Sequence, residues 1–200
     1  MRKVLYVILA IAAIAAWRDW SQRAIARPPG VLVPEYPRQE EAAQPQALEI
    51  EGYRLMPRAG FAIRARVLSR ENYYWGSEAD LSPMDLALGW GAMSDQTVLD
   101  RIEITQGSRW YFTRYAAPGP LADRDIIRHS GNMHMVPANP QVRKQLKQIR
   151  RGDIVQAKGS LVDIDHPSGF RWRTSLSRED TGAGSCEIFY LEGIQIESRS

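Results

Sequence analysis

The pattern of apolar and polar positions divides the chain into three parts. The run from Val4 to Trp17 contains no charged residue and follows two basic residues. Residues 27–47 are rich in proline, glutamine and glutamate, a composition that cannot bury a core. After Leu48, apolar positions recur with a period of two in several segments, as is typical of half-buried strands. The pattern predicts a hydrophobic helix over residues 1–26, a linker over 27–47 and one folded domain over 48–200.

The N-terminal run has the order of a secretory signal, with positive residues before a short apolar stretch. Ala13-Ile14-Ala15 resembles a small-x-small cleavage site, so cleavage is one alternative. No helix breaker follows, and Trp17 and Trp20 suit a membrane interface, which favours an uncleaved signal anchor. A hydrophobic first helix of a cytoplasmic domain is the third alternative. We expect a single-pass protein of the bacterial inner membrane whose C-terminal domain lies in the periplasm.

Several strands are predicted in the domain by alternating apolar residues. Two strands are expected on either side of a turn at Pro57 to Gly60. Arg101 to Gln106 and Arg109 to Tyr115 flank Gly107-Ser108 and predict a hairpin. Further strands are expected at Ile154 to Ile164, at Phe170 to Ser177 and at Cys186 to Glu197.

Three short helices are expected between these strands. Ser82 followed by Pro83 is typical of a helix start, and this helix is predicted to end at Gly89. A second helix is expected from Ser94, and an amphipathic third from Asn139-Pro140. The predicted fold class is mainly β (α+β). It is a single β-barrel or a strongly bent antiparallel sheet with about three inserted helices, an element order that fits OB-like and sortase-like barrels.

Composition restricts the classes of partner. The net charge is +3, and the basic residues are spread along the chain, which argues against a dedicated nucleic-acid surface. The single cysteine, Cys186, excludes an internal disulfide and a Cys-rich zinc site. His129 and His134 are five residues apart and do not match the i, i+4 spacing of a helical metal pair. We therefore expect no nucleic-acid partner, no cofactor and no metal.

Two motifs near the C-terminus suggest chemistry. Asp180-Thr181-Gly182-Ala183 matches the short aspartic-protease signature, but too few residues follow it to build the supporting strands, so we predict a turn. Cys186 is a candidate nucleophile, which requires a neighbouring histidine or cation to lower its pKa. The alternative is a buried structural cysteine.

The chain order resembles the sortase family: an N-terminal anchor, a polar linker, a β-rich domain, a histidine, a Gly-Asp turn, a cysteine and a late arginine. The resemblance implies a cysteine-dependent transpeptidase or hydrolase. Cys186 would be its nucleophile, His129 or His134 its acid and base, and Arg178 or Arg199 its oxyanion stabiliser. The chain departs from that family because TGAGSC replaces an apolar strand before the cysteine, and because Arg199 is the penultimate residue.

A second resemblance covers most of the domain. The segments SPMDLALGWGAMSD, RWYFTRY, HSGNMHMVPA and WRTSLSREDTGAGSCE are similar to a family of bacterial envelope proteins of unknown function. This resemblance implies no activity and no catalytic residue. We expect a membrane-anchored envelope protein that acts as a non-catalytic binding or accessory module, with the membrane and an envelope protein as candidate partners. The alternatives are the cysteine-dependent enzyme and an OB-like nucleic-acid-binding module that uses Arg64, Arg66, Arg171 and Arg173.

Overall fold

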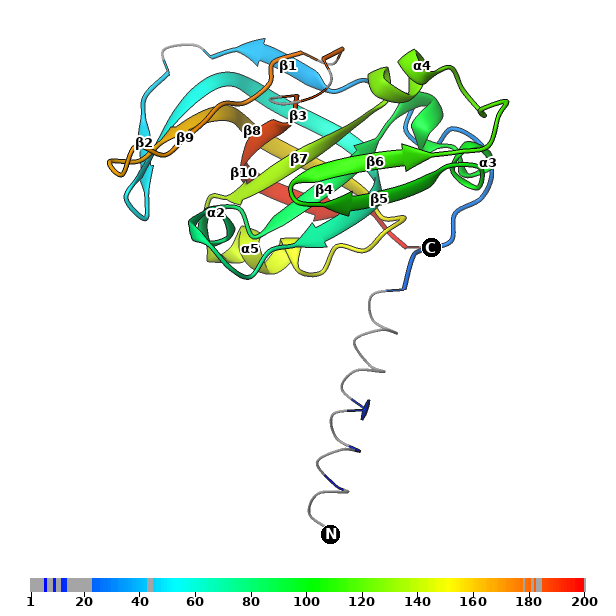
Figure 1. Cartoon of the computed structure of the whole chain (residues 1–200), viewed down its shortest axis with the longest axis horizontal. Helices are drawn as coiled ribbons and strands as arrows, with labels where there is room; N and C mark the ends of the chain where they lie inside the picture. Colours follow the sequence, from blue (N-terminus) through cyan, green and yellow to red (C-terminus); the bar gives the residue numbers. More distant parts are fainter. Residues whose placement is uncertain are drawn as a thin grey trace.

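The structure is a computed structural model that describes residues 6, 9, 12, 13, 23–42, 45–177, 179, 180, 182 and 185–199. The domain is mainly β (Figure 1). Its strands are β1 (Arg38–Glu41), β2 (Leu48–Ile50), β3 (Tyr53–Asn72), β4 (Met84–Gly89), β5 (Glu103–Gly107), β6 (Trp110–Arg114), β7 (Ser130–Pro137), β8 (Ile154–Asp165), β9 (Arg171–Trp172) and β10 (Glu187–Ile196). Its helices are α2 (Ser77–Leu81), the 3-10 helix η1 (Gly91–Ser94), α3 (Gln96–Leu99), α4 (Asp123–Arg128) and α5 (Pro140–Leu146).

Eight of the strands form one strongly curved sheet with the order β1-β3-β4-β7-β10-β8-β9, and β2 lies beside β3. β7 and β10 run parallel, whereas the other neighbouring strands are antiparallel. β3 pairs with β8 through its N-terminal part and with β4 through its C-terminal part. The sheet therefore curves back toward itself without forming a regular closed barrel. The predicted mainly β fold with a strongly bent sheet is confirmed. The sheet is not purely antiparallel as predicted, because β7 and β10 run parallel, and a closed barrel is not formed.

The largest apolar cluster is built from alternating residues of β3, β4, β7, β8 and β10. Val142 and Leu146 of α5 join this cluster, which places the predicted amphipathic helix against the sheet. A different cluster covers the opposite face of β4, where the β5–β6 hairpin, α3 and α4 pack. Apolar area removed from water stabilises a fold by roughly 25 cal/mol per Å². The apolar area buried in this second cluster therefore holds the hairpin against the sheet.

The segment from Met84 to Gly89 is strand β4 and not the predicted helix. All six of its residues are buried, because β4 lies between β3 and β7 and both of its faces are covered. A strand that is buried on both faces shows no alternation in its sequence. The Ser82-Pro83 signal was therefore misleading: no helix begins there, and α2 has already ended at Leu81, one residue before Ser82.

The first turn of the domain also lies elsewhere than predicted. β2 and β3 meet at Glu51 and Gly52, which both have positive φ, of 50° and 84°. β3 then continues through Pro57, opposite β8, with a register shift between Pro57 and Ala59. Proline lacks a backbone donor, and a bulge is one of the few places within a sheet that tolerates it.

Residues 23–36 form an extended segment, here called the strap, most of which the composition assigns to the linker. The strap lies against the domain: Val33 is fully buried in the largest core cluster. Its amide and that of Leu32 donate to Ser94 Oγ, at 3.0 and 3.1 Å, and its carbonyl accepts from the amide of Gly91 at 2.7 Å. A polar segment can be fixed in this way because the domain satisfies its backbone groups.

Among the residues that the structure describes, no helix has both the length and the apolar character needed to cross a membrane. Tyr6, Leu9, Ala12 and Ala13 are helical. The rest of the run from Val4 to Trp17 lies outside the described residues, so the N-terminal membrane helix stays a prediction.

Candidate functional site

The site is organised around the turn of the β5–β6 hairpin. The sequence predicted this hairpin correctly but placed its turn one residue too early, at Gly107-Ser108. Ser108 and Arg109 connect the two strands, and both have positive φ, of 51° and 69°. Two-residue hairpin turns of this kind favour glycine, which has no Cβ, and asparagine, whose short polar side chain tolerates positive φ; most other side chains are strained there. An arginine at such a position requires compensating contacts.

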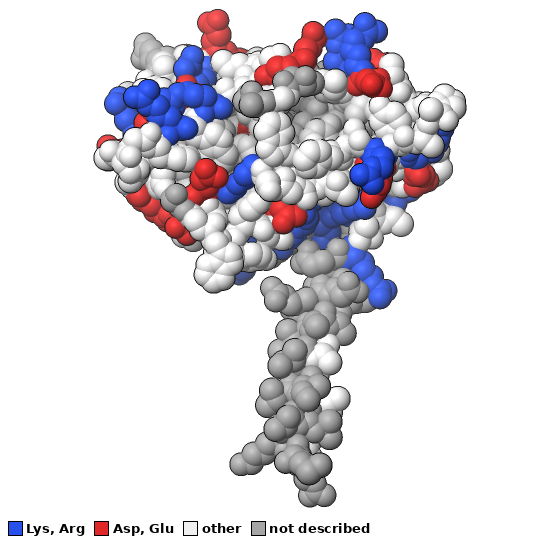
Figure 2. Space-filling model, viewed as in Figure 1, with Lys and Arg blue, Asp and Glu red and all other residues white. Residues whose placement is uncertain are grey.

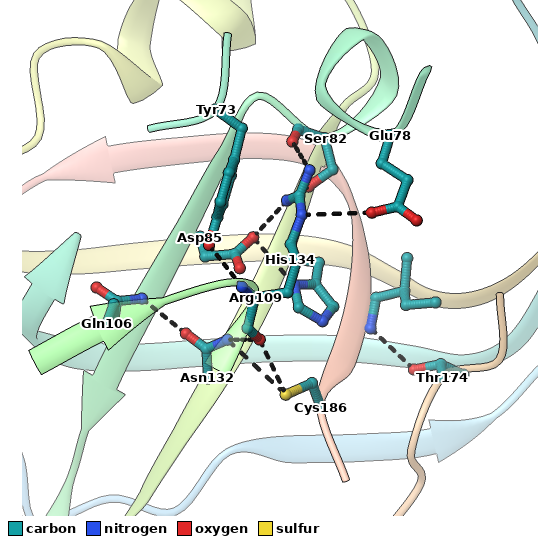
Figure 3. Close-up of polar contacts among 11 residues, drawn as sticks. Tyr73, Glu78, Ser82, Asp85, Gln106, Arg109, Asn132, His134, Thr174 and Cys186 are labelled. Carbon is teal, nitrogen blue, oxygen red and sulfur yellow. Dashed lines mark hydrogen bonds and ion pairs between the residues drawn. The ribbon is translucent and has the colours of Figure 1, made fainter. Parts of the chain in front are cut away.

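Arg109 has those contacts (Figure 3). Its Nη1 donates to Asp85 Oδ1 at 2.8 Å, and its Nη2 donates to the carbonyl of Ser82 at 2.9 Å. The guanidinium stacks 3.7 Å from the ring centroid of Tyr73, and Trp172 lies at 5.4 Å on the same group. The Asp85 side chain is completely buried, so the pair with Arg109 compensates a charge that water cannot reach. The arginine thus joins the hairpin turn to β4.

His134 of β7 lies directly opposite Asp85 in the sheet. Its Nδ1 is 2.9 Å from Asp85 Oδ1, a close contact that lacks the alignment of a hydrogen bond. The imidazole is buried and packs on Trp172, with the ring centroids 4.6 Å apart. His134 is therefore part of a buried polar network with Asp85 and Arg109.

Asn132, two residues before His134, fixes the backbone of the hairpin. Its Nδ2 donates to the carbonyl of Arg109 at 3.1 Å, and its Oδ1 accepts from Gln106 Nε2 at 2.7 Å. Cys186 Sγ lies 3.8 Å from both Asn132 Nδ2 and the carbonyl oxygen of Arg109. In Figure 3 the cysteine approaches the backbone of Arg109, while the guanidinium points the other way, toward Asp85 and Ser82.

The surroundings of Cys186 favour the neutral thiol. Its pKa is raised to about 11, chiefly by burial; nearby carboxylates, including those of Glu187 and Asp180, act in the same direction, and the contact with Asn132 acts in the opposite one. A nucleophilic cysteine requires the reverse, a pKa lowered by a cation or by histidine. Among the described residues, no histidine contacts Sγ within hydrogen-bonding distance.

The other members of the predicted catalytic set have different neighbours. His129 Nε2 lies 2.5 Å from the hydroxyl of Tyr36 in the strap. Arg199 makes two contacts of 2.8 Å with the carboxylate of Asp153. Arg178 lies outside the described residues. In the described part of the chain these residues do not meet Cys186, and the proposed roles of Cys186, His129, His134 and Arg178 stay predictions.

A cavity of about 310 Å³ adjoins the polar network, between the β5–β6 hairpin, α4 and the segment before β10. Cys186 and Asn132 line it on the side of the network. Two kinds of side chain make up much of the remaining wall. They are the rings of Trp110, Tyr111 and Tyr115 and the carboxylates of Asp123, Asp180 and Glu187. The described lining residues include no lysine and no arginine.

The groups in the cavity wall are held by local contacts. The hydroxyl of Tyr115 donates to Asp123 Oδ1 at 2.5 Å, and Asp180 Oδ2 accepts from Ser175 Oγ at 2.6 Å. Burial raises the pKa of Tyr111, which keeps this phenol neutral. Carboxylates next to aromatic faces favour a positively charged organic group. In the described part of the chain no three His, Cys, Asp or Glu side chains are placed to hold a metal ion.

Comparisons of this chain with family models, with curated proteins and with solved structures found no match. Its function is therefore inferred from the geometry of the site. The sequence prediction missed Asp85, Arg109 and Asn132. Asp85 had a detectable signal, because it is the one charge in the apolar run MDLALG. Arg109 had another, because it follows Gly-Ser in a tight turn.

Proposed function

We propose that this chain is a non-catalytic binding module of the bacterial envelope that takes a positively charged organic group into the cavity beside Cys186. The proposal includes an uncleaved N-terminal anchor in the inner membrane, with the domain in the periplasm. The observation that carries it is the cavity wall, in which three carboxylates and three aromatic rings occur without a lysine or arginine among the described lining residues.

The size and chemistry of the cavity support this ligand class. Pockets for small ligands begin at roughly 300 Å³, and the cavity of about 310 Å³ is large enough for one side-chain-sized group. An ammonium or guanidinium group gains roughly 0.5 to 2 kcal/mol from an aromatic face, depending on how far it is desolvated. The side chain of a lysine or arginine on an envelope protein partner has this chemistry.

The buried network beside the cavity supports a binding role because it holds the hairpin side of the cavity wall in place. Arg109 and Asn132 fix the backbone of the hairpin turn, and the hydroxyl of Tyr111 in β6 lies 2.6 Å from the hydroxyl of Ser130 in β7. Trp110 and Tyr111 follow Arg109 directly, so their positions depend on this turn. A preformed wall lowers the entropic cost of binding.

The cysteine-dependent enzyme has less support. Cys186 has a raised pKa, its described contacts are an amide and a carbonyl, and the charges that shift its pKa are carboxylates. Each of these features disfavours the thiolate that nucleophilic catalysis uses.

The OB-like nucleic-acid module has partial support. The path β3-β4-β7-β10-β8 and the pairing of β8 with β3 are compatible with a partly open OB-like barrel. Three of the four arginines expected to bind phosphates are engaged or buried within the domain, however, and only Arg171 is exposed without a contact of this kind to the described residues. Arg64 binds Glu197 at 2.7 Å, Arg66 is buried, and Arg173 binds Asp165 at 2.5 Å.

The proposal is tested by calorimetric titration of the full chain in dodecyl maltoside. The probe is N-acetyl-lysine methylamide, and its control is N-acetyl-norleucine methylamide, which has a similar shape without the charge. We expect binding of the lysine derivative and none of the norleucine derivative. Equal binding of the two, or binding of neither, contradicts the proposal.

A further inference from the structure

A second cavity, here called the arginine pocket, lies where the strap joins the domain. Its volume is about 400 Å³. Three arginines from separate parts of the chain line it: Arg27 of the strap, Arg66 of β3, and Arg151 of the loop before β8. A cluster of like charges is electrostatically unfavourable, because each charge disfavours the protonated form of its neighbours.

Two of these guanidiniums have buried donors without a partner. Arg66 is 4% exposed; its Nη1 donates to the carbonyl of Ser94 at 3.0 Å and its Nη2 contacts Gln96. Arg27 donates from Nε to the carbonyl of Gly152 at 2.9 Å. The Nε of Arg66 and the Nη2 of Arg27 are buried and find no acceptor among the described residues. Buried donors of this kind are rare in folded proteins, and each is costly.

The arginines also act on one another. Burial, and then the positive charges of Arg27 and Arg151, lower the pKa of Arg66 to about 10. The direction shows that the protonated guanidinium is disfavoured where it stands. An anion in the pocket would relieve this repulsion.

The carboxylates within electrostatic range bind other groups. Asp95 Oδ1 accepts from the amides of Gly30 and Thr97, at 3.0 and 2.8 Å. Asp100 Oδ1 accepts from Gln96 Nε2 at 2.6 Å. Glu197, which lies near Arg27, is bound by Arg64. These acids reduce the positive potential without occupying the free donors of the pocket.

The strap holds Arg27 in a fixed position. The amide of Ile25 donates to the carbonyl of Arg151 at 2.7 Å. Gly152 has a φ of 87°, and a Cβ there would lie 2.1 Å from the carbonyl oxygen of Ile25. Only glycine permits so close an approach of the strap at Ile25. Because Arg27 lies two residues further along the strap, this contact also sets the position of Arg27.

We propose that the arginine pocket binds a phosphate group, and that the headgroup of an anionic phospholipid supplies it. Guanidinium groups match phosphate oxygens in charge and in geometry. Arg27 follows Trp17 by ten residues, which span at most about 35 Å even when fully extended. Figure 2 shows Lys and Arg atoms at the lower edge of the domain. In Figure 1 the strap joins the domain at this same edge. The lipid source rests on the proposed membrane anchor, whereas the phosphate chemistry does not.

The test is calorimetric titration of the full chain in dodecyl maltoside at low salt with three probes. They are dihexanoyl phosphatidic acid, dihexanoyl glycerol and inorganic phosphate. The pocket variant carries Arg27→Gln and Arg151→Gln, and it keeps Arg66 because that side chain also holds Ser94. The matched control carries Lys144→Gln and Lys147→Gln, which remove the same charge from exposed positions on and next to α5.

We expect phosphatidic acid to bind the wild type, with an affinity at least about tenfold lower for the pocket variant and within about twofold of wild type for the control. Dihexanoyl glycerol is expected not to bind. If inorganic phosphate binds as tightly as phosphatidic acid, the phosphate site stands and the lipid source is wrong. If neither phosphate probe binds, or if the lysine control loses as much affinity as the pocket variant, the proposal is overturned.

Discussion

Arg109 in the hairpin turn and Asp85 in the middle of β4 form an ion pair with an Nη1 to Oδ1 distance of 2.8 Å. The carboxylate is completely buried and the guanidinium side chain is 15% exposed. This pair joins two elements that are separate in the sheet topology, because β5 and β6 form their own two-stranded sheet. The ion pair therefore fixes the hairpin side of the cavity beside Cys186 to the main sheet.

Removing this pair should destabilise the domain strongly. We expect Arg109→Gln to lower the free energy of unfolding by about 3 kcal/mol, because the Asp85 charge is left buried without its partner. Arg114→Gln, on the same hairpin, is the matched control. Arg114 pairs with Glu103 at 3.6 Å on the surface, so its loss should cost less than about 0.5 kcal/mol. Urea unfolding of the full chain measures both, and equal effects would show that the Asp85 pair is not structural.

The strap should contribute to the stability of the domain. Val33 is fully buried, whereas Val31, two residues earlier, is 49% exposed. We expect Val33→Ala to lower the free energy of unfolding by roughly 1 to 3 kcal/mol, because it leaves a cavity in the main core. Val31→Ala should change it by less than about 0.5 kcal/mol. A tether that does not pack on the domain would give two small effects in the same unfolding assay.

The thiol of Cys186 should stay protonated through neutral pH. Its folded-state pKa is raised from 9.0 to about 11. The associated stability is therefore fully present below pH 9 and is lost as the pH rises through 11. We expect iodoacetamide to react slowly at pH 8 and faster only toward pH 11. The unfolding midpoint of Cys186→Ala should fall less than that of wild type between pH 9 and pH 11.

An activated nucleophile would behave differently. Its alkylation rate would reach a plateau below pH 8, since the thiolate would already be the main form there. That result would favour the cysteine-dependent enzyme over the binding module.

The C-terminal end of the domain should show the opposite dependence on pH. A hydrogen-bonded ion pair with Arg64 lowers the pKa of the Glu197 carboxyl from 4.5 to about 2. The stability that it contributes is present above pH 4.5 and is lost as the pH falls through 2. Thermal unfolding should show a difference between wild type and Glu197→Gln at pH 6 that shrinks toward pH 2.5. Glu35→Gln, which removes an exposed carboxylate 3.3 Å from Arg64, should show little difference at either pH.

The sequence was informative wherever one side of an element faces solvent. The β5–β6 hairpin was predicted because apolar residues alternate on both sides of Gly107-Ser108. Helix α5 was predicted because Asn139 caps it and Val142 and Leu146 form its apolar side. β4 was missed because both of its faces are buried, which removes the period from the sequence.

The candidate site was only partly predictable for a different reason. Cys186 and His134 were selected as reactive residue types, and the structure places both in or beside the buried network. Their neighbours come from other strands: Asp85 reaches His134 across the β4–β7 register, and Arg109 arrives on a hairpin outside the main sheet. Such pairings depend on strand order, which local patterns do not encode.

The central claim is that the carboxylates of the cavity bind a positive charge. It is tested most directly by the affinity of N-acetyl-lysine methylamide for the double variant Asp123→Asn, Asp180→Asn. The control is Glu103→Gln, which removes a carboxylate of the β5–β6 hairpin that does not line the cavity. We predict an affinity at least about fivefold lower for the double variant and unchanged for the control. An affinity that is the same in wild type and in both variants would contradict the claim.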